Sequence, residues 1–214
     1  MTTVAYDELY LDDAMENLGD MVEYAVGDCG YQPDEFLDWF VSSGIASKFE
    51  KGNPKYVAGM SGVELAEAVL RETNIASKGI LIEQSGERGR EYWAGWILAY
   101  YQWITGQRFE DIIDSGLKLS TVLNMYIHHE ADVSKFVESA NKIIRRNKEK
   151  AKSKLHNIRK ARGFTQQQLS DASGVSLRMI QLYEQKQNDI GKAQVRMVVN
   201  LARALGCDVE DLLE

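Results

Sequence analysis

Apolar residues recur every three or four positions through most of this chain, which is the spacing of helices that bury one face. The clearest stripe covers residues 11–25, and Gly27 and Gly30 follow it as stop signals. Runs that alternate β-branched and polar residues are almost absent, so little indicates strands. We therefore expect an all-α fold.

Two further helix starts are predicted from local signals. Pro33 is followed by acidic residues, which suits a first helical turn, and the apolar face that follows ends at Gly44. Ser61 and Glu64 form a capping-box pattern ahead of another apolar stripe. We expect helices to begin near residues 33 and 61.

Residues 92–104 carry three of the four tryptophans, Trp93, Trp96 and Trp103, together with three tyrosines, on a predicted helix closed by Gly106. Aromatic stripes at helical spacing usually pack inside a domain, which favours an internal core. The alternative is a groove that receives a partner protein, because exposed aromatic clusters mark interfaces.

From Asp132 another helical stripe runs to residue 144 and then stops. The next residues are rich in Lys and Arg, and Ala151 is the one apolar residue between Arg145 and Lys154. This pattern predicts three parts: an acidic helical domain (1–144) for a partner or ligand, a basic helical connector (145–153) and a C-terminal domain (154–214). The connector is either a solvated face or a contact for phosphates.

The charges divide unevenly between the two ends of the chain. Residues 1–141 hold 10 basic and 24 acidic groups, net −14, whereas residues 142–214 hold 15 and 8, net +7. An acidic body joined to a basic tail domain is expected when only the tail must meet a polyanion. The overall charge of −7 therefore does not argue against binding of a polyanion by this tail domain.

Cysteine usage and the N-terminal residues indicate a cytoplasmic protein. Cys29 and Cys207 match no zinc or redox spacing, so we interpret each as a small buried hydrophobic residue in a reducing compartment. No apolar stretch approaches the ~20 residues of a membrane helix. Asp7, Asp12 and Asp13 stand where a signal peptide carries basic residues.

His128, His129, Glu130 and Asp132 supply metal-type ligands within five positions. Adjacent histidines on a helix point about 100° apart, so we interpret this segment as a polar helix start rather than a metal site. The chain has no Gly-rich phosphate loop and no nucleophile elbow. We expect no cofactor, no metal and no enzymatic activity.

The segment from Leu155 to Leu213 reads as five short helices. Thr165 with Gln168 predicts a capped start for the second, Gly174 supplies a tight turn, and Ser176 caps the third. The positions expected to face the core are Leu155, Ile158, Ala161, Leu169, Ala172, Ile180, Tyr183, Val195, Val198, Val199, Ala202, Leu205, Val209, Leu212 and Leu213.

Two short helices joined by a glycine turn in a small basic domain form the unit that places its second helix in the major groove. The segment resembles the Cro and phage-repressor (XRE) helix-turn-helix family, with a five-helix lambda-repressor-like fold, over roughly Lys154–Glu214. The matching motifs are IRKARG (158–163), TQ (165–166) through Leu169, SGVS (173–176), Ile180, YE (183–184) and LARALG (201–206). One departure is Lys186, where the family commonly has glycine, and it puts the geometry of the following loop in doubt.

The resemblance implies which residues contact DNA. The exposed face of the recognition helix would carry Ser176, Leu177, Arg178, Gln181 and Leu182. Arg178 can donate two hydrogen bonds to one guanine, Gln181 can read adenine in the same way, and the two leucines can contact thymine methyl groups.

Other matching positions imply phosphate contacts and a structural pair. Gln166 would hold a phosphate at the start of the second helix. Lys186, Gln187 and Asn188 are further candidates for phosphate contacts. Arg159 and Glu184 occupy the positions of a buried ion pair that locks the first helix to the third.

These features predict a repressor that binds a double-stranded DNA operator as a homodimer. Residues 24–30, 54–65 and 92–106 are similar to the leading domains of regulators in toxin-antitoxin-like operons, which implies an antitoxin whose N-terminal domain binds a cognate toxin. The alternative is a small-molecule-sensing regulator, or an enzyme whose N-terminal domain carries the main activity.

Overall fold

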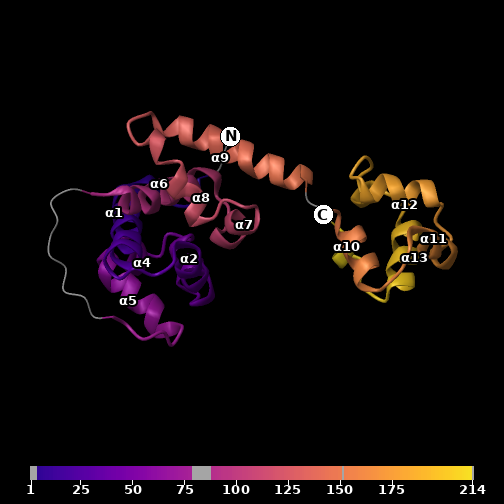
Figure 1. Cartoon of the computed structure of the whole chain (residues 1–214), viewed down its shortest axis with the longest axis horizontal. Coiled ribbons are helices and arrows are strands. Elements are labelled where there is room, and N and C mark those ends of the chain that lie inside the picture. The colour runs from indigo at the N-terminus through magenta and orange to yellow at the C-terminus, as the bar shows by residue number, and fades with distance from the viewer. Residues whose placement is uncertain (1–3, 79–87, 151, 214) are drawn as a thin grey trace. The chain divides into compact units, whose positions relative to one another are not determined.

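The computed structural model describes residues 4–78, 88–150 and 152–213, except for the side chains of residues 148–150. Within these ranges all regular structure is helical, which confirms the all-α prediction. The chain divides into two compact units, residues 1–149 and 150–214, each with its own apolar core (Figure 1). No helix in the described ranges is long and apolar enough to cross a membrane.

The N-terminal unit is built mainly from α-helices. They are α1 (Leu11–Val22), α2 (Pro33–Ser42), α3 (Ile45–Phe49), α4 (Pro54–Val57), α5 (Gly62–Glu72), α6 (Arg90–Thr105), α7 (Phe109–Asp114), α8 (Leu119–Asn124) and α9 (Val133–Lys150). Two short 3-10 helices, Glu8–Tyr10 and Tyr126–His128, and a π-helix, η2 (Glu23–Asp28), complete it. The predicted connector, residues 145–153, overlaps the last turns of α9.

Helices α1 and α6 lie against each other in this unit (Figure 1). Their contact depends on glycine, because a Cβ atom on Gly95 would lie 2.2 Å from the carbonyl oxygen of Leu18. Trp103 is buried in the surrounding core, and Trp93 and Trp96 are half-buried against it. These positions support an internal core for the aromatic residues of α6.

The local start and stop signals act largely as expected. Pro33 begins α2, and Ser61 with Glu64 forms the capping box that starts α5. Gly106 ends α6 with a φ of 61°, a left-handed conformation that favours glycine. The stop predicted at Gly27 is wrong, since α1 continues as the π-helix η2 to Asp28.

The C-terminal unit contains α10 (Lys154–Ala161), α11 (Gln166–Ser173), α12 (Leu177–Glu184) and α13 (Val195–Leu205). Two 3-10 helices, Ile190–Lys192 and Glu210–Leu212, follow α12 and α13. The second of these stands where a fifth helix was expected, and its buried Leu212 closes the core.

Most core positions predicted in this unit are buried or half-buried, but three are wrong. Ala161 and Ala172 are exposed, and Val195 is 76% exposed at the first position of α13. Each lies at or near the end of its helix, where the apolar stripe no longer faces the neighbouring helices. Burying the small side chain of alanine stabilises a helix only slightly, so an alanine has little influence on which face of the helix turns inward.

Both cysteines are free thiols. Cys29 is buried in the N-terminal core, and Cys207 is half-buried against the C-terminal one. Burial raises the pKa of both thiols, which suits unreactive side chains.

Candidate DNA-binding interface

Polar side chains cap the starts of α11 and α12, and a glycine ends α11 between them. The Thr165 hydroxyl accepts a hydrogen bond from the Gln168 amide, and the Gln168 side-chain oxygen accepts one from the Thr165 amide, which completes a capping box. Gly174 ends α11 with a φ of 68°. Ser176 then caps α12 by accepting from the Met179 amide. The two helices therefore meet in the order and with the caps that were predicted.

Helix α12 buries one face and exposes the other. Ile180 and Tyr183 point into the C-terminal core. On the other face Ser176 and Arg178 are exposed, and Gln181 is half-buried. The guanidinium of Arg178 makes no hydrogen bond or ion pair with another described residue, so it is available to an external partner.

Leu177 and Leu182 complete this face, and both are half-buried. Part of each side chain remains exposed beside the polar residues of α12. Such partly exposed leucines can contact methyl groups without leaving a polar atom unpaired.

The loop after α12 settles the question raised by Lys186. This lysine has a φ of 54°, a left-handed conformation that is rare for residues other than glycine. The amides of Gln187 and Asn188 both donate to the carbonyl oxygen of Leu182, at 2.9 and 3.2 Å. The loop thus adopts the glycine-type backbone with a lysine, and all three predicted phosphate contacts in it are exposed.

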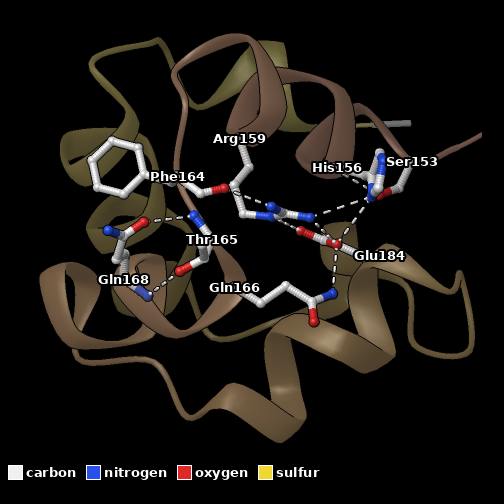
Figure 2. Close-up of polar contacts among 8 residues, drawn as sticks. All are labelled: Ser153, His156, Arg159, Phe164, Thr165, Gln166, Gln168 and Glu184. Atoms are coloured by element: carbon white, nitrogen blue, oxygen red, sulfur yellow. Dashed lines mark hydrogen bonds and ion pairs between the residues drawn. The ribbon is translucent and has the colours of Figure 1, made fainter.

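The carboxylate of Glu184, at the end of α12, is the polar centre of the domain (Figure 2). Arg159 donates through Nε to Oε1 at 2.5 Å and through Nη2 to Oε2 at 2.9 Å. Both side chains are only 3% exposed. This two-pronged contact is the ion pair that the family resemblance implied, and it joins α10 to α12.

Two more side chains converge on the same carboxylate, as Figure 2 shows. Gln166, the first residue of α11, donates through Nε2 to Oε2 at 2.8 Å. The Nδ1 atom of His156 lies 3.1 Å from Oε2. Glu184 therefore connects α10, α11 and α12 through one group.

These contacts decide the ionisation of Glu184. Burial acts to raise the pKa of its carboxyl group. Hydrogen bonds from Arg159, Gln166 and His156 outweigh burial and hold the pKa below its ordinary value of 4.5. The hydrogen bond to Glu184 also raises the pKa of Arg159. The cluster is therefore a charged pair that stays ionised at neutral pH.

Two residues of this cluster, His156 and Gln166, differ from what the sequence predicted. His156 was not singled out from the sequence, although it lies three residues before Arg159 and therefore on the same helix face. Gln166 was expected to hold a phosphate, and here it is half-buried with its amide bound to Glu184.

The histidine-rich segment near residue 128 is separate from this site. The ring of His129 stacks on Tyr126, and its Nδ1 atom lies 2.8 Å from the Tyr126 carbonyl oxygen. Asp132 accepts a hydrogen bond from the Ser134 amide and caps the start of α9. Within the described ranges no three His, Cys, Asp or Glu side chains come close enough to hold a metal ion.

Comparison with known proteins identifies one part of the chain. Residues 155–212 match the family model described as helix-turn-helix. No curated protein and no solved structure matches the chain. The matched residues cover α10 to the last 3-10 helix, which is the C-terminal unit derived above. This unit is therefore a helix-turn-helix domain of the XRE type, the kind through which transcription regulators bind DNA.

Proposed function

We propose that the protein is a sequence-specific repressor that lays the exposed face of α12 in the major groove of an operator. The observation that carries this proposal is the division of α12 into two roles. Glu184 at its end is buried and held by three side chains, while Arg178 near its start is exposed with its donors free. A helix fixed at one end and exposed along one face suits base reading.

In this proposal the residues of α12 divide the reading of bases. Arg178 donates two hydrogen bonds to the O6 and N7 atoms of a guanine, and Gln181 pairs in the same way with adenine. Leu177 and Leu182 contact thymine methyl groups. Such a surface reads few bases by hydrogen bonds, so the shape of the DNA contributes to recognition as well.

Phosphate contacts come from residues around α12 and α11. The Ser176 hydroxyl accepts from an amide and keeps its own proton to donate to a phosphate oxygen. Lys186, Gln187 and Asn188 are exposed in the loop beyond α12. Gln166 contacts a phosphate while its amide orientation is set by Glu184. The basic residues of 145–153 add to the attraction without specifying sequence.

We further propose that two copies bind one operator. A homodimer would place two α12 helices about 34 Å apart, one turn of B-DNA, and would require a two-fold symmetric site. An operator footprint with two related half-sites at this spacing would support a dimer, and a single asymmetric half-site would contradict it.

The N-terminal unit is proposed to neutralise a cognate toxin, so that the protein is both antitoxin and repressor of its own operon. Its excess of acidic groups, 24 against 10 basic ones in residues 1–141, suits a basic partner. Co-expression with the product of the adjacent gene tests this role. Growth restored by the full chain supports it, and toxicity unchanged by the chain overturns it.

The DNA-reading roles are tested by selecting bound sequences from a random duplex library. Arg178→Ala should lose the preference for guanine at one position, worth about 1–3 kcal/mol of discrimination. Arg203→Ala is the matched control, because it removes an equal charge from an exposed position on α13. An unchanged base preference in Arg178→Ala, or the same change in both variants, would refute the assignment.

A second measurement tests the phosphate contacts. The affinity should fall with salt with a log-log slope of about 0.9 per phosphate contacted, and Lys186→Ala should lower the slope by about that amount. A flat salt response would exclude binding dominated by phosphates.

A further inference from the structure

The N-terminal unit contains a polar depression that the DNA-binding function does not use. It consists of two adjoining hollows of ≈ 390 and ≈ 630 Å³, which share Ser47, Glu50 and Arg108 as lining residues. We call it the α3–α7 hollow, because Glu50 follows α3 and Arg108 precedes α7. These volumes lie in the range of about 300–1,000 Å³ that is typical of small-molecule sites.

Glu50 gives the hollow a nearly buried carboxylate, 8% exposed. Its Oε2 atom accepts a hydrogen bond from the Phe109 amide at 3.0 Å. Its Oε1 atom lies 3.9 Å from Nε of Arg108, an ion pair that is too long for a hydrogen bond. An ionised carboxylate can accept about four hydrogen bonds, so Glu50 has capacity left among the described residues.

Gln102 supplies a second acceptor without a donor. This residue lines the larger hollow and is 1% exposed. Its Nε2 atom donates to the carbonyl oxygens of Glu50, at 3.4 Å, and Gln107, at 3.1 Å. These two bonds fix the orientation of the amide, since the reverse orientation would set oxygen against oxygen. The Oε1 atom has no hydrogen-bond partner among the described residues, and native proteins rarely leave a buried acceptor unpaired.

The charges around the hollow are predominantly negative. Asp38, Glu110 and Asp114 line the smaller part together with Glu50. The positive groups are Arg108 and Lys51, and Arg108 forms ion pairs with both Glu110 and Glu50. The hollow therefore carries more acidic groups than basic ones.

We propose that the α3–α7 hollow binds a small organic cation that presents N–H donors, an alkylammonium or guanidinium compound. Such a group satisfies Glu50 with a charge-assisted hydrogen bond and supplies a donor to the Gln102 side of the hollow. A divalent metal fits less well, since no three acidic side chains in the described ranges converge on one point. An anion would face unpaired acceptors.

The test is isothermal titration calorimetry of the full chain with agmatine, which carries an ammonium and a guanidinium group. Wild type should give saturable binding at one site. Glu50→Gln keeps an oxygen for the Phe109 amide but removes the charge, so the affinity should fall about tenfold to a hundredfold. N-carbamoylputrescine, which replaces the guanidinium by a neutral urea, should bind wild type more weakly than agmatine.

The control variant is Asp13→Asn, which removes an equal charge from an exposed position that lines neither hollow. It should bind agmatine like wild type. If circular dichroism shows that Glu50→Gln is unfolded, Asp114→Asn at the rim should weaken binding severalfold instead. No saturable heat with wild type, wild-type affinity in the folded hollow variants, or equal weakening in Asp13→Asn would each overturn the proposal. None of these measurements involves DNA, so they are independent of the proposed repressor function.

Discussion

The two units hold their helices in place by different means. The N-terminal unit has a large apolar core in which α1 and α6 approach so closely that Gly95 has no room for a side chain. The C-terminal unit has far fewer buried apolar side chains, and three of its helices meet at the buried carboxylate of Glu184. A small domain buries a smaller share of its surface than a large one, so we expect the polar cluster to contribute more to the arrangement of its helices.

The units also differ in how they treat a buried carboxylate. Glu184 receives two hydrogen bonds from Arg159 and one from Gln166. Glu50 receives one hydrogen bond, from a backbone amide, and its second oxygen has only a long ion pair of 3.9 Å with Arg108, beside a hollow that the residue lines. A carboxylate saturated by its own protein serves the fold, whereas one left partly unpaired beside a cavity is available to a ligand.

The largest effect is expected when the C-terminal pair is broken. Arg159→Met leaves Glu184 buried without its main partner, and should cost that unit about 3–5 kcal/mol. All four tryptophans, residues 39, 93, 96 and 103, lie in the N-terminal unit. Urea unfolding of the N-terminal unit, followed by tryptophan fluorescence, should therefore be unchanged. The unfolding of the C-terminal unit, followed by circular dichroism, should move to lower urea concentrations.

A double variant tests the reason for this loss. Adding Glu184→Leu to Arg159→Met removes the stranded charge, and should recover much of the lost stability. A double variant less stable than Arg159→Met would show that the individual contacts, rather than the unpaired charge, carry the effect.

The next effect lies in the other unit. Gly95→Ala places a methyl group 2.2 Å from a backbone oxygen of α1, so the helices must separate, at a cost of about 1–3 kcal/mol. In this variant the unfolding of the N-terminal unit, followed by tryptophan fluorescence, should move to lower urea concentrations. The unfolding of the C-terminal unit should stay unchanged. Gly27→Ala is the control, because its nearest atoms are 3.8 and 3.9 Å away. Equal losses in the two variants would contradict the close contact.

A smaller effect is expected on acidification. The folded pKa of Glu184 lies below its ordinary value of 4.5, so its charge stabilises the fold above about that pH. This contribution is lost as the pH falls through the folded pKa, because protonation weakens the hydrogen bonds from Arg159. The difference in unfolding free energy between wild type and Glu184→Gln should be constant near neutral pH and shrink below pH 4.5. A difference independent of pH would refute the charged state of the cluster.

The smallest effect concerns the loop after α12. Lys186→Gly relieves a left-handed backbone and should stabilise the C-terminal unit by up to about 1 kcal/mol, less the added flexibility of the unfolded chain. Lys186→Ala keeps the backbone strain and should show no gain. Equal stabilisation by the two variants, measured by thermal unfolding, would point to the lysine charge instead.

Local signals were the part of the fold that could be predicted from the sequence. The capping boxes at Ser61 and Thr165, the proline start of α2 and the glycine end of α6 depend on residues within a few positions of each other. The motif-dense helix-turn-helix segment was predictable for the same reason. The exposure of Val195 was not, because helical spacing alone does not say where a neighbouring helix stops.

The polar sites were predictable only in part. The pair of Arg159 and Glu184 followed from the family resemblance, and His156 could have been added from its spacing along α10. The hollow beside Glu50 could not have been predicted, since Gln102 and Arg108 reach it from positions more than fifty residues away in the chain. Only the packing of α3, α6 and α7 brings them together.

The π-helix η2 has a consequence for chain length. Its Cys29 amide bonds to the Tyr24 carbonyl oxygen, five residues back, so each turn holds one residue more than an α-turn. Removing one exposed residue such as Gly27 would let the segment close as an ordinary α-helix while Tyr24 and Ala25 stay inside. We therefore expect this segment to absorb a one-residue deletion with the arrangement of α1 and α2 unchanged.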